Sequence, residues 1–238
     1  MFTFFRGSLF YGYYFLSLEF LCGFSVILLL IASFTKSAQF PFSRWLPKAI
    51  SAPTPVSSLV HRRTLVTAGL ILLINFSNLL LNNLVLIIIM LIGVFTIFFS
   101  RITALVEEDI KKVVALRTLS QIGFSMLTLG LGLSFVSFIH LVSHALFKRC
   151  LFMQVGYLIH CNYGQQDGRG YGYNGVFPMF MQVQLLVTLF CLCGLFFSSG
   201  IVRKDIILEL FFLNNNYLLL RFMFFISIFL TFGYSYRL

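Results

Sequence analysis

The sequence predicts an all-α membrane protein, a polytopic helix bundle with about seven spans of roughly 20 residues each. Hydrophobic residues make up 59% of its 238 residues and charged residues only 10%, and the mean hydropathy is +0.96. Soluble domains carry about 25% charged residues. Apolar runs of spanning length also recur along the whole chain. Lipid, and not water, is therefore the expected surrounding.

Seven apolar runs are the candidate spans. They cover residues 15–34, 56–76, 84–100, 113–131, 135–159, 180–197 and 217–231. The first run leads directly into Lys36, and the sixth is followed by Ser198-Ser199-Gly200 and then Arg203-Lys204-Asp205. Short or interrupted spans in paired positions are typical of transporters built from related halves, in which broken helices frame the ion sites. We expect two discontinuous helices, at these two places.

Lys36 and His61 lie at the ends of a proline-interrupted stretch in otherwise apolar sequence. Pro41, Pro53 and Pro55 fall between them. Non-helical backbone at membrane depth is tolerated only where protein buries it or where it lines a wet cavity. Ionisable residues at such depth are functional candidates by default. Lys36 and His61 are therefore predicted site residues.

His140, His144 and Lys148 follow one another at intervals of four, so they share one face of a helix within the run 135–159. Histidine exchanges protons near neutral pH, and burial favours the neutral form of lysine. The stripe therefore favours a proton relay over a metal site, since no carboxylate or suitably placed cysteine in this run completes a ligand set. Interhelical hydrogen bonding by the histidines, with Lys148 extending to the membrane surface, is the structural alternative.

Lys204 and Asp205 are the last predicted site residues. The serine–glycine sequence before them fits a helix that is interrupted and restarted. An interfacial pair outside the bilayer fits the spacing equally well. Two other polar segments have simpler interpretations: residues 107–112, where acids precede bases, predict a solvated helix start, and the turn-rich residues 161–175 predict a surface loop.

Several classes of site are not predicted. The five cysteines show neither a disulfide framework nor a zinc spacing. The sequence has no nucleotide-binding loop, iron–sulfur cysteine cluster or quinone-pocket signature, so we assign no cofactor. The net charge of +10 is not gathered into a basic patch, which argues against nucleic acid as a partner.

At these same residues the chain resembles the chain 5 family of mitochondrial respiratory complex I (NADH-ubiquinone oxidoreductase), which is related to cation/proton antiporters. The matching segments run through most of the chain in family order. They are Lys36-Ser-Ala-Gln-Phe-Pro-Phe, Trp45-Leu-Pro, Ala52-Pro-Thr-Pro-Val-Ser, Leu59-Val-His61, Thr64-Leu-Val-Thr-Ala-Gly69, Asp109-Ile-Lys-Lys-Val-Val-Ala-Leu, Ser120-Gln-Ile-Gly and His140-Leu-Val-Ser-His-Ala-Leu-Phe-Lys148.

The resemblance implies a role for each candidate. Lys36 corresponds to the lysine of the first broken helix and His61 to the connecting residue on the next helix. His140, His144 and Lys148 correspond to the central relay, and Lys204 with Asp205 corresponds to the second broken helix on the exit side. Residues 1–76 would end one inverted repeat of an antiporter-like fold, and residues 77–238 would form most of the second.

The resemblance also implies the setting. The protein would be a multi-pass subunit of the mitochondrial inner membrane that carries protons during electron transport, in contact with lipid and with other membrane subunits of complex I. NADH, FMN, iron–sulfur clusters and ubiquinone would belong to the rest of the complex. Since the family has helices beyond both ends, we expect an internal portion of the subunit. A stand-alone monovalent cation/proton antiporter and a non-functional truncated product are the alternatives.

Seven arginines occupy positions where that family commonly has serine or another small residue. They are Arg44, Arg62, Arg63, Arg101, Arg117, Arg149 and Arg203. An arginine at the centre of a spanning helix costs about 2.5–3.5 kcal/mol on insertion scales. We hypothesise that an invertebrate mitochondrial gene was translated with the standard code, in which AGA and AGG codons give arginine in place of serine. A TGA codon, tryptophan in the mitochondrial code, would then end the chain after Leu238. A nuclear copy or pseudogene is the alternative.

Overall fold

The computed structural model describes residues 9–45, 65–80, 82–169, 178–194, 199–214 and 218–236, and the regular elements within these ranges are all helical. The α-helices are α1 (Leu9–Ser37), α4 (Leu65–Asn75), α5 (Asn83–Val106), α6 (Ile110–Gly130), α7 (Ser134–Cys161), α8 (Met179–Cys193), α9 (Ser199–Asn214) and α10 (Leu218–Tyr236). Two short 3-10 helices, Phe42–Arg44 and Ser77–Leu80, follow α1 and α4.

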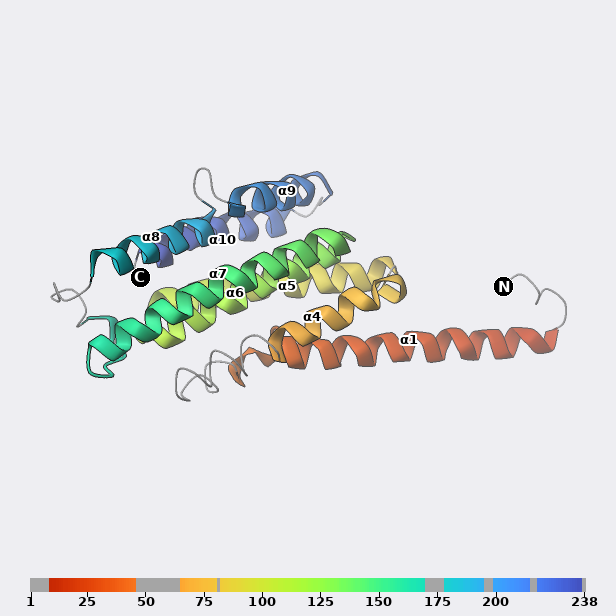
Figure 1. Ribbon diagram of the computed structural model, residues 1–238. Coiled ribbons are helices and arrows are strands. Elements are labelled where there is room, and N and C mark those ends of the chain that lie inside the picture. The colour runs from red at the N-terminus through yellow and green to blue at the C-terminus, as the bar shows by residue number, and fades with distance from the viewer. Residues whose placement is uncertain are drawn as a thin grey trace.

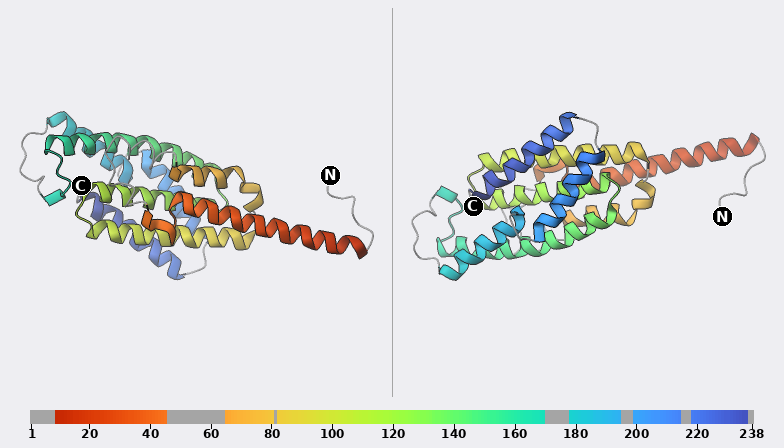
Figure 2. Two further views of the ribbon diagram at one scale, coloured as in Figure 1. Left: turned by 90° about the horizontal axis from the view of Figure 1, so that it is seen from below. Right: turned by 90° about the horizontal axis from the view of Figure 1, so that it is seen from above.

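Helix α6 is the centre of the bundle. Its side chains are buried without interruption from Val113 to Leu129, because α5, α7 and α4 all pack against it. Figure 1 shows the surrounding order: α1 and α4 lie on one side of α5, α6 and α7, and α8, α9 and α10 lie on the other. Part of α1 extends beyond the rest of the bundle toward the N-terminus in both views of Figure 2.

Helices α5 and α6 meet along a seam of small residues. A Cβ atom added at Gly130 would lie 2.7 Å from the main-chain nitrogen of Met90, and one added at Gly123 would lie 2.6 Å from Thr96 Oγ1. Close backbone approach through small residues is the usual way that membrane helices pack. Apolar side chains complete the seam on both sides, among them Ile97 and Leu127. The two helices are therefore held in one relative position.

Helices α1 and α4 form a second close contact. A Cβ atom at Gly69 would lie 2.6 Å from the main-chain oxygen of Ser33, so α4 lies directly against the α1 backbone at this point. Leu30, Phe34 and Leu70 join the apolar cluster that connects this pair with α6. This contact positions the start of α4 beside the middle of α6.

Where the structure describes them, the predicted spans are helical, and the helices differ from them in extent. Three described helices, α5, α6 and α7, are long and apolar enough to cross a bilayer, and shorter apolar helices lie at Gly23–Ser37, Val66–Asn75, Met179–Cys191 and Leu220–Thr231. The total of about seven spans therefore stays a prediction. Helix α9 is not among the predicted spans, because Lys204, Asp205 and Glu209 dilute its apolar pattern, but it begins where the serine–glycine sequence fits the restart of an interrupted helix. Its apolar side chains Ile207 and Phe211 are nevertheless completely buried, against the α5–α6–α10 cluster.

The two predicted helix breaks lie at element ends. Helix α1 ends at Ser37, one residue after Lys36, and Ala38 has a positive φ of 55°. Helix α8 ends at Cys193, where Gly194 takes the left-handed conformation of a helix C-cap, and α9 begins at Ser199. Residues 46–64 and 195–198, which follow these ends, lie outside the described part of the chain. Discontinuous helices at these places stay a prediction.

Candidate functional site

A cavity of ≈ 780 Å³ lies between α4, α6, α7 and α8. Helix α7 contributes the largest part of its wall, and the lining includes all three members of the predicted stripe, His140, His144 and Lys148. Most of the remaining wall is apolar, for example Leu70 and Ile122. Ionisable side chains in such surroundings are costly unless they face a protein interior or a wet cavity. The arrangement therefore brings His140, His144 and Lys148 to one cavity.

The two histidines lie one above the other on α7. Their rings are nearly parallel, at 11°, with centroids 6.2 Å apart. His140 is 5% exposed and also contacts the Phe124 ring of α6, at 6.1 Å between centroids. His144 and Lys148, one and two turns further along, are half-buried. A proton could pass along this stripe through groups spaced by about one helical turn, roughly 5.4 Å.

Helix α6 supplies polar groups to the opposite wall. Gln121 is 3% exposed and lines the cavity together with Ser125. The hydroxyl of Ser137 on α7 donates a hydrogen bond to the main-chain oxygen of Ser125, at 2.9 Å. This bond fixes the N-terminal part of α7 against α6, three residues before His140. The position of the stripe relative to Gln121 is thus set by a direct contact between the two helices.

Helices α7 and α8 are joined by a second polar contact at the cavity wall. Gln154 on α7 is 3% exposed, and its Oε1 accepts a hydrogen bond from Thr188 Oγ1 at 2.8 Å. Gln154 lies on the same side of α7 as the His140–His144–Lys148 stripe, and it lines the same cavity. Tyr157 and Gln184 extend the polar part of the lining from α7 and α8.

Lys204 reaches back from α9 to the end of α8. Its Nζ donates to the main-chain oxygen of Cys193 at 2.5 Å, which is a favourable position because the last carbonyls of a helix carry partial negative charge. Arg117 of α6 donates to the sulfur of the same Cys193, at 3.4 Å. Both cations interact electrostatically with His144. Lys204 is therefore joined to the end of α8, and its charge acts on His144.

The other predicted residues lie apart from this cavity or outside the described chain. Lys36 is exposed in the last turn of α1 and is not part of the cavity wall. Asp205 is exposed, whereas its neighbour Lys204 is half-buried. His61 lies outside the described residues. The structure thus brings together His140, His144 and Lys148, with Lys204 nearby.

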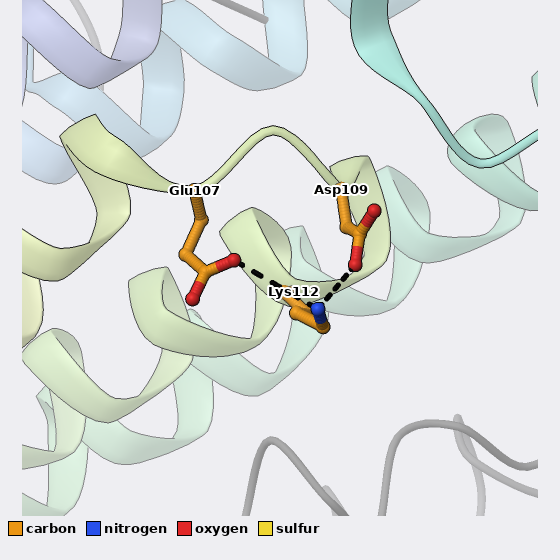
Figure 3. Close-up of polar contacts among 3 residues, drawn as sticks. All are labelled: Glu107, Asp109 and Lys112. Carbon is orange, nitrogen blue, oxygen red and sulfur yellow. Dashed lines mark ion pairs between the residues drawn. The ribbon is translucent and has the colours of Figure 1, made fainter.

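The charged segment between α5 and α6 forms a separate ionic cluster. Lys112 forms ion pairs with Asp109 and, at 3.9 Å, with Glu107, as Figure 3 shows. Arg169, from the loop after α7, pairs with Glu108. All these side chains are at least partly exposed. The segment is therefore a solvated helix start held to a surface loop, as the sequence indicates. Its residues do not line the cavity.

The suspect arginines fall into different environments. Arg101 is completely buried on α5, where its guanidinium lies 5.0 Å from the centre of the Phe124 ring and donates to the main-chain oxygen of Ser227 on α10. Arg117 is 3% exposed. Arg149 is exposed at the edge of the cavity. The side chains of Arg44, Arg62, Arg63 and Arg203 lie outside the described part.

Two glutamines of the cavity wall are not among the site residues predicted from the sequence. Gln121 and Gln154 lie within long apolar runs, and an uncharged amide there attracts less notice than a histidine or lysine. A usable signal existed, since a polar side chain in a spanning helix almost always faces the bundle interior. No group of three or more potential metal ligands among His, Cys, Asp and Glu occurs in the described residues.

Comparison with known proteins decides the family. Residues 9–231 match the family described as NADH:quinone oxidoreductase/Mrp antiporter, transmembrane. The chain belongs to this family. A member of the NADH:quinone oxidoreductase/Mrp antiporter family with this all-helical fold is an integral membrane protein, and the resemblance to chain 5 is confirmed by its relatives.

Two nematode relatives of the family are very similar over the whole chain. NADH-ubiquinone oxidoreductase chain 5 of Ascaris suum is 70% identical and that of Caenorhabditis elegans is 68% identical, each over 100% of this chain. The chain 5 protein of the insect Locusta migratoria is 45% identical over 96% of the chain. The chain covers 44% and 45% of the length of the two nematode relatives, and 40% of the insect one.

Solved structures of respiratory and antiporter assemblies share the fold of this family member. A chain of the Mrp complex from a Dietzia species aligns with a TM-score of 0.73 at 32% identity, over 89% of this chain and 24% of that chain. A chain of the membrane-bound sulfane sulfur reductase, an archaeal respiratory membrane complex, aligns with a TM-score of 0.77 at 20% identity, over 88% and 45% of the two chains. The second likeness concerns the fold alone.

Proposed function

We propose that this chain is part of a proton-translocating membrane subunit of NADH:ubiquinone oxidoreductase. The observation that carries the proposal is the cavity that gathers His140, His144 and Lys148 within a bundle of this family. The nematode and insect relatives, which are chain 5 proteins of NADH-ubiquinone oxidoreductase, support complex I as the setting. Proton movement would drive no bond chemistry in this chain, and cofactors would be held by other subunits.

The proposed path has three parts. Protons enter at Lys36 and pass through His61 and water to the central stripe of His140, His144 and Lys148, and they leave through Lys204 and Asp205. The bond between Lys204 and the end of α8 supports a connection between the second and third parts. Alternating charge on neighbouring groups would move each proton, because a nearby positive charge favours the neutral form of the next group.

The path rests on an architecture that is also part of the proposal. It comprises about seven spans, two of them discontinuous, with residues 1–76 ending one inverted repeat and residues 77–238 forming most of the next. The ends of α1 and α8 next to Lys36 and before Lys204 agree with such breaks. The mitochondrial inner membrane is the proposed location, with lipid and other membrane subunits of the complex as partners.

A cation/proton antiporter is the second candidate function. The likeness to a chain of the Mrp complex at 32% identity specifically favours it. In that case a sodium or potassium gradient would drive proton movement without any electron donor. Proton uptake by vesicles in response to such a gradient, with NADH absent, would distinguish the antiporter from the respiratory subunit.

The test of the main proposal uses the full-length subunit in its assembled complex, reconstituted into lipid vesicles. The variants are His144→Leu, His144→Gln and Lys148→Met, and Lys111→Met in the solvated helix start is the matched lysine control. Proton translocation per NADH oxidised should fall at least roughly ten-fold in the first three, because each removes a proton-transfer group. The control should translocate normally.

Assembly of each variant complex is checked on native gels before translocation is compared. An assembled His144→Leu complex that pumps as well as the parent would contradict the proposed relay. Equal losses in Lys111→Met and Lys148→Met would show a general effect of removing a lysine and would contradict it as well.

A further inference from the structure

We propose that the amides of Gln121 and Gln154 hold water in the cavity and thereby position the proton path between His144 and Lys148. This inference rests on the proposed function for the role of the path. The binding of water by the two amides, however, is a separate claim with its own measurement. Both glutamines would be positioning residues, since neither side chain titrates in the range where proteins work.

Gln121 is the first of the two amides. It projects from the central helix α6 into the cavity wall and is 3% exposed. Its side-chain nitrogen is buried and finds no hydrogen-bond partner among the residues that the structure describes. An amide nitrogen carries two donor hydrogens, so Gln121 has two bonds to give to whatever occupies the cavity.

Gln154 faces the same space from α7. Thr188 is bonded both to Gln154 Oε1 and to the main-chain oxygen of Leu185, at 2.8 Å in each case. In this orientation the buried Nε2 of Gln154 has no partner within the described ranges. Because a hydroxyl has a single proton, the reversed amide, with its nitrogen donating to Thr188, is an equally good assignment. In that case the oxygen of Gln154 is left to accept from the cavity, so one amide atom is available in either orientation.

His144 contributes a third available polar atom. Its Nε2 is buried and likewise has no hydrogen-bond partner among the described side chains and backbone. Lys148 follows His144 by four residues on the same helix face, a rise of about 6 Å along the helix axis. Proton transfer over such a spacing proceeds through an intervening water, because donor and acceptor must be within hydrogen-bond reach.

The energetics favour water as the occupant. A buried polar group left without a hydrogen bond costs about 1–3 kcal/mol, so three such groups around one cavity would destabilise the folded state considerably. An internal water satisfies buried polar groups when it finds about two to four partners. A cavity of ≈ 780 Å³ has room for several waters. An acyl chain would fill the apolar wall but would leave all three polar atoms unsatisfied.

Glutamine suits this role chemically. Its amide both donates and accepts hydrogen bonds, so it can orient a water without binding the transferred proton. In the proposed step, the His144 imidazolium releases its proton to a water, and that water passes a proton to the neutral amine of Lys148. No atom is gained or lost, and one positive charge moves from His144 to Lys148.

The experiment measures water access and proton translocation in the same intact complex, held in lipid nanodiscs and in vesicles. Cys150 lines the cavity and is exposed, so it serves as the reporter thiol. The charged reagent sulfonatoethyl methanethiosulfonate reaches it only through water, whereas N-ethylmaleimide also enters from lipid. Peptide mass spectrometry quantifies labelling at Cys150 separately from the other cysteines.

The double variant Gln121→Leu/Gln154→Leu should lower labelling by the charged reagent several-fold, with N-ethylmaleimide labelling unchanged, and it should lower translocation per NADH. Gln121→Asn keeps an amide and should retain most of both signals. Gln166→Leu, in the exposed loop after α7, is the matched control and should behave as the parent.

Each other outcome would contradict a specific part of the inference or of the proposed function. Unchanged charged-reagent labelling in the double variant would mean that the amides do not hold the water, which ends the inference. Reduced labelling with normal translocation would mean that this water is not on the proton path. Normal translocation in His144→Leu would instead defeat the proposed function, whatever the labelling shows.

Discussion

The two sides of α6 are built in opposite ways. Toward α5 the helix presents Gly123 and Gly130, and the two backbones approach so closely that a methyl group would clash. Toward α7 and α8 the same helix presents Gln121 and Ser125 to a cavity of ≈ 780 Å³. One side is therefore a packed seam, and the other presents a few polar groups to a largely apolar cavity.

The difference suggests separate roles for the two sides of α6: the α5 side stabilises the fold, and the α7 and α8 side serves the proposed proton path. The seam holds α6 rigidly, because dense packing leaves no room for the helices to slide. The polar side depends on that rigidity, since a proton path tolerates little change in the distances between its groups. The hydrogen bond of Ser137 with Ser125 joins α7 to α6, and the hydrogen bond of Thr188 with Gln154 joins α8 to α7. The comparison predicts that substitutions on the seam affect stability and that those on the polar side affect translocation.

Two buried arginines, one on each side of α6, do not fit this division into a packed side and a polar side. The largest expected effect concerns the identity of these two residues. Arg101 lies on the α5 side and Arg117 on the α8 side. We expect the native chain from its source membranes to contain serine at both positions. Each arginine would otherwise add about 2.5–3.5 kcal/mol to the free energy of membrane insertion.

Mass spectrometry of peptides that contain residues 101 and 117 is the measurement. Lys112, whose codons are not in question, provides an internal reference within the same region. Arginine at both positions in the native peptides would refute the decoding hypothesis, and the two buried cations would then be real parts of both sides of α6.

Gly130→Ala is expected to have the next largest effect, because it breaks the seam directly. The new methyl group would lie 2.7 Å from the Met90 main-chain nitrogen, so the helices must move apart. Overpacking of this kind costs typically about 1–3 kcal/mol. The melting temperature of the purified complex in detergent should fall.

Gly156→Ala is the matched control, since a Cβ atom there meets nothing within 4 Å and the residue is also helical. It should be neutral or slightly stabilising, because alanine favours a helix over glycine. Equal losses of thermal stability in both variants would contradict the claim that the α5–α6 contact is specially close.

Lys112→Gln is expected to have the smallest effect. Lys112 belongs to neither the α5–α6 seam nor the cavity, so it serves as a reference for both sides of α6. The ion pairs of Lys112 with Asp109 and Glu107 are solvent-exposed, and exposed pairs contribute little and are screened by salt. Neither translocation per NADH nor the melting temperature at physiological salt should change measurably. A loss of translocation would place the solvated helix start on the proton path.

Sequence reasoning succeeded where spacing alone determines geometry. His140, His144 and Lys148 share a face because an α-helix repeats every 3.6 residues, whatever surrounds it. Helix α9 is not predicted as a span for the complementary reason: its charges reduce the mean hydropathy, although Ile207 and Phe211 are buried by α5, α6 and α10. Gln121 is a polar residue within an apolar run, which indicates that it faces the bundle interior, but only the structure shows that it lines the cavity.

The sequence by itself determined the class of protein, the helical surroundings and the face of α7 that carries the titratable groups, since these follow from composition and local periodicity. Only the tertiary structure decided that this face shares one cavity with Gln121 of α6, that Gln154 at the cavity wall bonds to Thr188 of α8, that Lys204 bonds to the end of α8, and that Lys36 is exposed. These facts depend on which helices become neighbours. Neighbours are chosen by packing between segments far apart in the chain, which local pattern does not encode.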